Sequence, residues 1–167
     1  MKTKALGRHL IVEFYNCNSE VINNVELVER YMNEAALNAG STIVKSVFHR
    51  FQPYGVSGVV VIAESHLAIH TWPEYNYASV DLYTCGTCVD PMKAYVYLKD
   101  KFESTSADIK EFSRGDIDTI ISNLQFKDEK MLKKAANDSV EPRGVVLWLR
   151  SYFNKGDGGS HDMSNAI

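Results

Sequence analysis

The chain carries six short segments with the pattern of β-strands, and this series constrains its fold more than any other feature. In residues 7–17, polar side chains alternate with Leu10, Val12 and Phe14, which gives a strand one strongly apolar face. Most of the gaps suit hairpins, whereas a parallel connection needs a crossover of roughly a dozen residues or more. The other expected strands are 42–51, 58–63, 66–72, 77–84 and 107–112.

Two helices are expected beside these strands. The first follows capping asparagines, covers about 24–39 and ends before Gly40, whose backbone tolerates the left-handed conformation. The second begins with Pro91, a residue favoured in the first helical turn, and extends to about residue 102. The continuous apolar run 58–63 is typical of a buried central strand. The pattern predicts an α+β fold, a two-layer sandwich whose antiparallel sheet is covered on one face by helices.

The character of the chain changes after about residue 122. Residues 128–137 have a helical pattern, 144–153 include an apolar run, and the glycine-rich stretch from 156 is typical of a flexible tail. We therefore expect one domain over 1–122, followed by a C-terminal extension over 123–167 that is partly helical and then flexible.

Charge and composition argue against several classes of partner. With a net charge of -3 and a pI of about 5.9, the chain lacks the basic surface that nucleic acids and anionic membranes require. Arg8, His9 and Glu13 interrupt what would be the apolar region of a signal peptide. No apolar segment approaches the length of a membrane span, and the odd set of three cysteines fits reduced thiols. We expect a cytoplasmic protein without nucleic-acid or membrane partners.

The region from Ser57 to Cys88 concentrates groups that can carry chemistry. Ser65 falls between two strand-like segments, His70 lies in the second of them, and Cys85 ends the next strand. A nucleophile, an imidazole and a thiol from adjacent strands could therefore converge. The residues alone fit a surface serine–histidine pair, a partly buried histidine and structural thiols at least as well. The spacing of Cys85 and Cys88 also suits a redox pair or half of a zinc site, but no second ligand pair accompanies it.

A longer pattern around these residues resembles a known family. The run ESHLAIHTWPEY at 64–75 and the run DLYTCG at 81–86 are similar to the signature of prokaryotic S-adenosylmethionine decarboxylases. The resemblance covers roughly residues 5–114. The short bacterial and archaeal type is matched also by LGRHL at 6–10, FHRF at 48–51 and PYGVSG at 53–58.

The resemblance implies a proenzyme that cuts itself between Glu64 and Ser65. In this family the serine attacks the preceding carbonyl and forms an ester. The position of Ser57 assists this processing, and that of His70 removes the α-proton of the esterified serine. Elimination and hydrolysis then leave a pyruvoyl group at position 65. The products would be a β chain over 1–64 and an α chain from residue 65 onward.

The resemblance also implies the reaction of the mature enzyme. The pyruvoyl group would form a Schiff base with S-adenosylmethionine, and Cys85 would donate a proton after loss of carbon dioxide. Phe51 and Trp72 match the residues that sandwich the adenine, and Glu74 matches the carboxylate that binds the ribose hydroxyls. The product would be decarboxylated S-adenosylmethionine, the aminopropyl donor for spermidine. Cleaved αβ protomers would pair as a symmetric homodimer with two sites at the interface, and no metal is implied.

Three alternatives stay open. A pyruvoyl-dependent arginine or ornithine decarboxylase on the same scaffold would keep Ser65, His70 and Cys85 but would not need the adenine and ribose contacts. A non-catalytic paralogue would require a broken processing site, and the expected residues are all present. A zinc or redox module would use Cys85 and Cys88.

Overall fold

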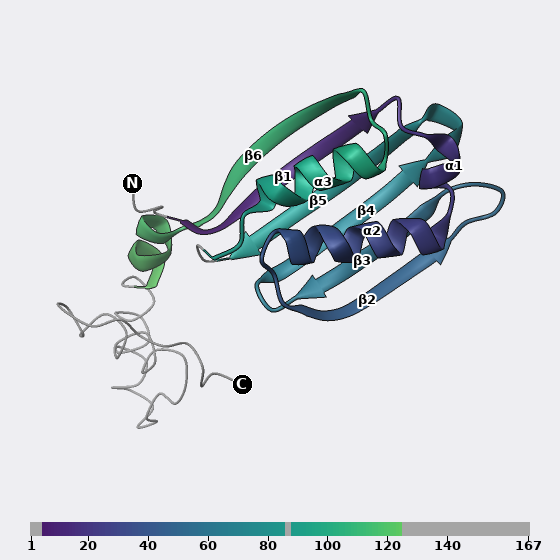
Figure 1. The fold of residues 1–167 in the computed structure, drawn as a ribbon. Helices are drawn as coiled ribbons and strands as arrows, with labels where there is room; N and C mark the ends of the chain where they lie inside the picture. Colours follow the sequence, from purple (N-terminus) through teal and green to yellow (C-terminus); the bar gives the residue numbers. More distant parts are fainter. Residues whose placement is uncertain (1–4, 86–87, 125–167) are drawn as a thin grey trace. The chain divides into compact units, whose positions relative to one another are not determined.

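The computed structural model describes residues 5–85 and 88–124. Six strands form one antiparallel sheet in the order β2-β3-β4-β5-β1-β6 (Figure 1). This confirms the expected sheet and each of its strands. The strands are β1 (Ala5–Tyr15), β2 (Ile43–Arg50), β3 (Val56–Ile62), β4 (Ser65–Trp72), β5 (Tyr77–Cys85) and β6 (Ser106–Asp116).

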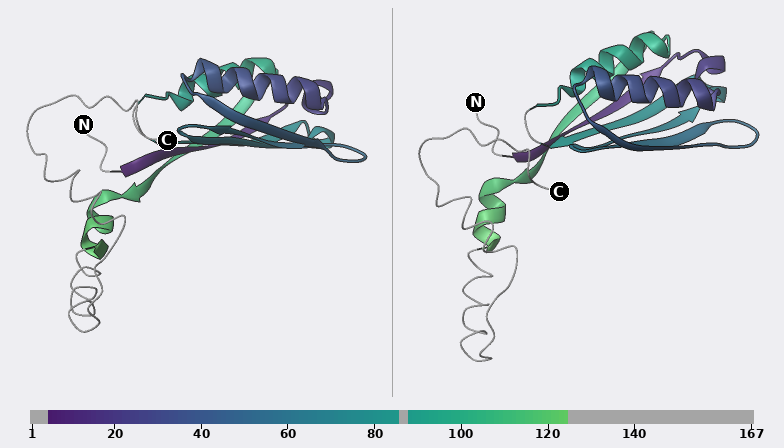
Figure 2. Two further views of the ribbon diagram at one scale, coloured as in Figure 1. Left: turned by 90° about the horizontal axis from the view of Figure 1, so that it is seen from below. Right: turned by 60° about the horizontal axis from the view of Figure 1, so that its bottom comes forward.

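The two expected helices lie on the same face of the sheet (Figures 1 and 2). They are α2 (Val25–Asn38), capped by the side chain of Asn24, and α3 (Pro91–Lys101), capped by Asp90. Gly40 follows α2 with φ +88°, as its predicted role at the helix end requires. Two short elements were not predicted, since neither contains enough residues for a periodic pattern: α1 (Ser19–Ile22) and the 3₁₀ helix η1 (Pro73–Tyr75).

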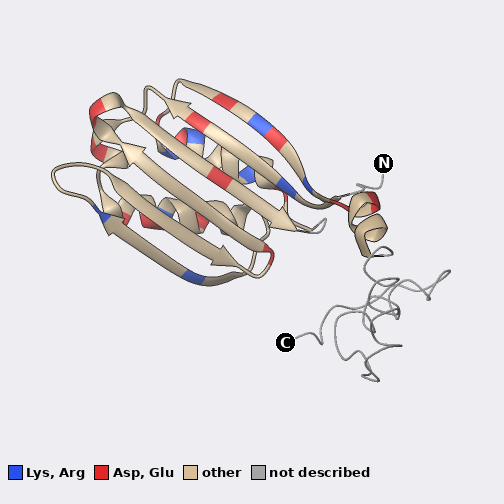
Figure 3. Cartoon of the chain, turned by 180° about the vertical axis from the view of Figure 1, so that it is seen from behind, with Lys and Arg blue, Asp and Glu red and all other residues tan. Residues whose placement is uncertain are grey.

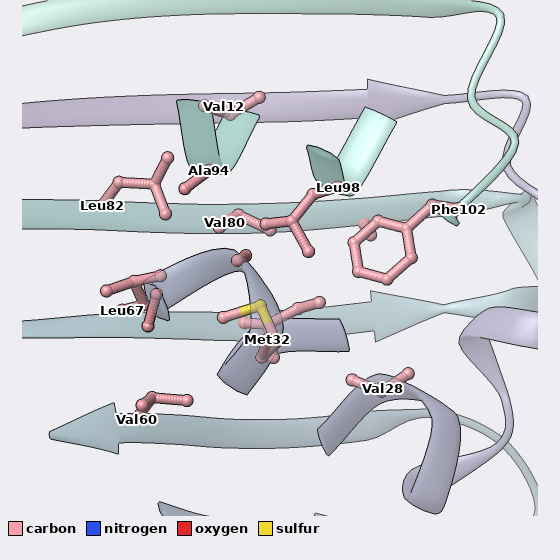
Figure 4. Close-up of a cluster of buried hydrophobic side chains, with 14 of the residues drawn as sticks. Val12, Val28, Met32, Val60, Leu67, Val80, Leu82, Ala94, Leu98 and Phe102 are labelled. Carbon is pink, nitrogen blue, oxygen red and sulfur yellow. The ribbon is translucent and has the colours of Figure 1, made fainter. Parts of the chain in front are cut away.

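The hydrophobic core lies between the sheet and the two long helices (Figure 4). The four inner strands β1, β3, β4 and β5 contribute alternate side chains to it, as β4 does with Leu67 and Ile69, whereas the edge strands β2 and β6 have no buried residue. Met32 on α2 and Leu98 on α3 are fully buried against them. Each such side chain contributes about 1.5–3 kcal/mol by leaving water. The core therefore fixes which face of every strand points away from the helices.

The other face of the sheet carries no helix in the described part of the chain and is seen in Figure 3. On β3, Val60 and Ile62 face the core, but Val61 is 38% exposed. Residues 58–63 are therefore part of an inner strand, as predicted, but in a single chain only one side of β3 is buried. Val47 on β2 and Phe112 on β6 also expose apolar surface on this helix-free face. β3 and β4 carry no charged residue here (Figure 3).

The chain divides into two compact units, 1–120 and 121–167. Residues 117–124 are helical. The helix predicted at 128–137 and the apolar run at 144–153 lie outside the described residues. Over 5–85 and 88–124, no helix is long and apolar enough to cross a membrane.

Candidate active site

The hairpin between β3 and β4 places Ser65 in an unusual backbone conformation. Ile62 pairs with Ser65, and Ala63 and Glu64 form the turn between them. Tight hairpins commonly need a residue with positive φ, and glycine supplies it without steric cost. Here the positive φ, +146°, falls on Ser65. A side chain in this region costs about 1–3 kcal/mol, so the peptide unit that joins Glu64 to Ser65 lies beside a strained residue.

The backbone carbonyl of Glu64 is held by the end of β5. The Cys85 N–H donates a hydrogen bond of 2.8 Å to the Glu64 oxygen. The carboxylate of the same glutamate accepts a bond of 3.2 Å from the Thr42 N–H. Attack on the Glu64 carbonyl would develop negative charge on its oxygen, and a fixed N–H donor stabilises such charge. The carbonyl therefore has a donor in place before any reaction begins.

The side chains around Ser65 complete this part of the sheet. The Ser65 Oγ lies 3.2 Å from Nδ1 of His66, whose ring packs edge-on against Tyr83 at 5.7 Å between centroids. Burial raises the pKa of Tyr83, and its interaction with the Cys85 thiol raises that pKa further. Cys85 itself is exposed. We call the group Glu64, Ser65 and Cys85 the serine end of the helix-free face.

The remaining predicted residues lie at the opposite end of the same strands. Ser57 pairs with His70 across β3 and β4, and its Oγ lies 2.8 Å from Nδ1 of His70. Trp72 ends β4, is 39% exposed and lies 6.2 Å from the His70 ring. We call this group the histidine end. Its members are Phe51, Ser57, His70, Trp72 and Glu74.

Two residues of the histidine end belong to neighbouring connections. Phe51 follows β2, is 48% exposed, and its N–H donates to the Gly55 carbonyl at 2.8 Å. Glu74 is exposed in η1 and lines a shallow hollow together with Tyr54. The loop after β2 and η1 therefore border the same hollow, which residues of α1 also line.

The two ends lie far apart within one chain. His70 follows Ser65 by five positions on the extended strand β4, which corresponds to about 17 Å at the usual rise of a strand. The expectation that the Ser65 nucleophile, the His70 imidazole and the Cys85 thiol converge is therefore wrong for a single chain. Ser65 and Cys85 do lie together, but His70 does not join them.

A polar network next to the serine end was not anticipated from the sequence. His9 on β1 contacts Asp81 on β5 at 3.3 Å and the Arg114 guanidinium at 2.9 Å. A guanidinium can only donate, so Nδ1 of His9 accepts from Arg114 and its Nε2–H donates to Asp81. Arg114 also lies 5.4 Å from the centre of the Tyr83 ring. The sequence signal that could have found this network was the alternation in β1, which places the His9 side chain on the face that points away from the core.

The cysteines offer no metal centre in the described part of the chain. No three His, Cys, Asp or Glu side chains within residues 5–85 and 88–124 are grouped as metal ligands. Cys88 is an exposed free thiol. Cys17 is buried, and this burial raises its pKa to about 11, so it is a poor nucleophile.

Comparison with known proteins identifies the family. Residues 8–115 match the family model described as S-adenosylmethionine decarboxylase, and the chain belongs to that family. It is 61% identical over 117 residues to the S-adenosylmethionine decarboxylase proenzyme of Thermosipho melanesiensis, covering 70% of this chain and 90% of the relative. The proenzyme of the same name from Thermotoga maritima is 58% identical with the same coverage.

A solved structure agrees with this assignment. The crystal structure of the adenosylmethionine decarboxylase from Aquifex aeolicus superposes with a TM-score of 0.64 at 35% sequence identity. The match covers 68% of this chain and 93% of that one. The fold and the family therefore agree.

Proposed function

We propose that this chain is a proenzyme that cuts itself between Glu64 and Ser65 and then decarboxylates S-adenosylmethionine. The observation that carries the proposal is the hydrogen bond from the Cys85 N–H to the Glu64 carbonyl oxygen, next to a serine with a φ of +146°. A donor is thus in place at the oxygen that attack would charge, and the neighbouring backbone gains relief when the peptide bond breaks.

Self-cleavage begins with the Ser65 hydroxyl. Its Oγ rotates away from His66 Nδ1, where it lies at 3.2 Å, and attacks the Glu64 carbonyl carbon. The amide becomes an ester, and the hydroxyl proton passes to the released nitrogen. The partner's His70, which the pairing of two chains brings to this site, then removes the α-proton of residue 65, the bond from Cβ to Oγ breaks, and Glu64 leaves as a carboxylate. The dehydroalanine left at position 65 takes up water and releases ammonia, which gives the pyruvoyl group. Ser57, bonded to Nδ1 of His70, fixes the orientation of that ring.

A pyruvoyl group at position 65 fits the surroundings of this residue. Such a group supplies an electrophilic ketone that takes up the substrate amine and accepts the electron pair left by carbon dioxide. Cys85 is exposed at the end of β5, and its own backbone N–H is bonded to the residue before position 65. Its exposed thiol, on a residue bonded to the neighbour of position 65, can return a proton to the substrate carbon.

The two ends of the helix-free face form complete sites when two chains pair. A twofold axis that crosses the strands between two facing sheets places the serine end of each chain over the histidine end of its partner. Such a pairing is isologous and gives two equal sites. It also covers the apolar side chains that a single chain exposes, such as Val47 at 54% and Val61 at 38%. The mature enzyme is therefore a homodimer of cleaved αβ protomers.

The histidine end suits the nucleoside of S-adenosylmethionine. Trp72 and Phe51 are exposed aromatic rings that can enclose an adenine, and their electron-rich faces favour a sulfonium nearby. Glu74 is an exposed carboxylate that can accept from two ribose hydroxyls. Arginine and ornithine offer no nucleoside for these three side chains. The catalytic domain is residues 1–122, consistent with the family match over 8–115, and 123–167 are an extension to it.

Mass spectrometry under denaturing conditions, combined with an assay of carbon dioxide release, tests the proposal. We expect mass spectrometry to show two chains, divided after Glu64. We also expect carbon dioxide to be released from S-adenosylmethionine but not from ornithine or arginine. A single chain of full mass with no turnover would favour a non-catalytic paralogue. Cleavage with turnover of ornithine or arginine alone would keep the chemistry and refute the substrate.

A further inference from the structure

Thr84 on β5, the residue paired with Ser65, has a buried hydroxyl without a partner. The residue is 2% exposed, and its Oγ1 makes no hydrogen bond. Among the described residues that are not exposed, Ser41 is the only other one with a fully buried, unpartnered side-chain oxygen or nitrogen. Buried hydroxyls normally find partners, because losing the hydrogen bonds of water without replacement is unfavourable. An exception at this position calls for a physical reason.

The strand register places Thr84 directly opposite Ser65. The neighbouring position is joined by the bond from the Cys85 N–H to the Glu64 oxygen. Bonded and non-bonded pairs alternate in an antiparallel ladder, so Ser65 and Thr84 form a non-bonded pair, with Cα atoms typically about 4.5 Å apart and side chains close. Thr84 also has the parity of Leu82, so its side chain lies on the core side of the sheet.

The Ser65 hydroxyl needs a new partner during attack. In the resting precursor its Oγ lies 3.2 Å from His66 Nδ1, on a residue whose side chain belongs to the helix-free face. Turning toward the Glu64 carbonyl carbon breaks this contact. The side chain opposite Ser65 offers a hydroxyl with its full hydrogen-bonding capacity unused.

We infer that the Thr84 hydroxyl takes over the hydrogen bond of the Ser65 hydroxyl and orients Oγ toward the Glu64 carbonyl during self-cleavage. The inference rests on the proposed self-cleavage and adds a residue to it. The bond that forms joins Ser65 Oγ to the Glu64 carbonyl carbon, and the bond that breaks joins that carbon to the Ser65 nitrogen. The hydroxyl proton ends on that nitrogen, and Thr84 itself exchanges no atom.

Three variants of the full chain test the role of this hydroxyl. Thr84→Val keeps the shape and removes the hydroxyl, Thr84→Ala also removes it, and Thr84→Ser restores it. The rate of self-cleavage is followed by denaturing gel after synthesis of each chain in a cell-free system. We expect cleavage at least tenfold slower in Thr84→Val and Thr84→Ala, and within threefold of the parent in Thr84→Ser.

Stability separates this role from a structural one. The unfolding midpoint is compared with and without Thr84→Val in a Ser65→Ala background, where no cleavage interferes. Because the hydroxyl has no partner in the precursor, we expect an equal or higher midpoint with valine. Slow cleavage of the valine variant with an unchanged midpoint and a fast serine variant supports the inference.

Two results would overturn it. If Thr84→Val and Thr84→Ala are both cleaved at the parental rate, the Thr84 hydroxyl has no role in cleavage. The proposed function would then stand without it. Equally slow cleavage in Thr84→Ser shows a packing effect and also contradicts the inference. A parent chain that never cleaves refutes the proposed function itself, and the inference with it.

Discussion

The two ends of the helix-free face are built in different ways. At the serine end the decisive features belong to the backbone: the φ of Ser65 and the hydrogen bond from the Cys85 N–H to Glu64. At the histidine end they belong to side chains, as in the Ser57–His70 pair and the exposed ring of Trp72. The first end is assembled by strand pairing within one chain. The second presents groups to a ligand or to another chain, and we infer that each end functions only against its counterpart.

The largest effect is expected from a charge placed between the two ends. Val59 on β3 lies between Val47 and Ala68 on the neighbouring strands. Val59→Glu would bury a carboxylate in the proposed contact of two sheets, at a cost of several kcal/mol. We expect a folded monomer by light scattering, in which self-cleavage falls below detection.

Val96→Glu is the matched control for this variant. Val96 lies on α3, on the other side of the molecule's sheet, and is 61% exposed. The Val96→Glu variant should stay dimeric and be cleaved at the parental rate. If the Val59→Glu variant is a monomer and is still cleaved, self-cleavage does not require the pairing of two chains.

The next effect concerns Cys85, whose backbone and side chain have separate roles. Cys85→Ala keeps the N–H that holds the Glu64 carbonyl, so self-cleavage should remain within about tenfold of the parent. The proton donor is lost, and decarboxylation should fall by about 10²–10⁴-fold. Rates of cleavage and of carbon dioxide release are measured on the same preparation. Equal loss of both rates would contradict this division.

A smaller effect is expected at Trp72, which belongs to the histidine end. Stacking of a base on an aromatic ring is worth about 1–3 kcal/mol. Trp72→Ala should therefore raise the KM for S-adenosylmethionine by about 5–150-fold, with less change in kcat. Tyr75→Ala is the control, because Tyr75 is an aromatic residue that is 74% exposed in η1, directly after β4. A KM increase of the same size in both variants would refute adenine stacking on Trp72.

The smallest effect measures the strain at the serine end. Neither Ser65→Gly nor Ser65→Ala can cleave, so their unfolding can be compared directly. Glycine accepts the φ of +146° that alanine does not, although it loses more backbone entropy on folding. We expect the glycine variant to be more stable by about 1 kcal/mol, or about 2–4 °C in Tm. Equal or lower stability would show that the strain at Ser65 is no larger than the entropy cost of glycine.

The sequence predicted the strands and the long helices because their patterns are local. Alternation in β1 and β4 assigns each side chain to a face, and the caps Asn24 and Asp90 mark where the helices begin. The contact between Cys85 and Glu64 depends on the register of β5 against β4. Many registers satisfy the same alternation, so this contact required the structure.

The separation of the two ends could not be predicted from the motif either. Ser65, His70 and Trp72 lie within eight residues of one strand, and closeness in the sequence suggested closeness in space. An extended strand does the opposite, since each residue adds about 3.3 Å. The resemblance to the family supplied a role for each residue but did not say which chain provides it.

Co-expression of two inactive variants tests most directly whether each site uses both chains. Ser65→Ala lacks the residue that is cut, and His70→Ala lacks the proposed base, so neither should cleave alone. In a mixed dimer, the intact Ser65 of the His70→Ala chain faces the intact His70 of the other chain. With tags of different mass, we predict cleavage of the His70→Ala chain only. Absence of cleavage in the mixture would show that the His70 of one chain does not act on the Ser65 of its partner, and would contradict the account.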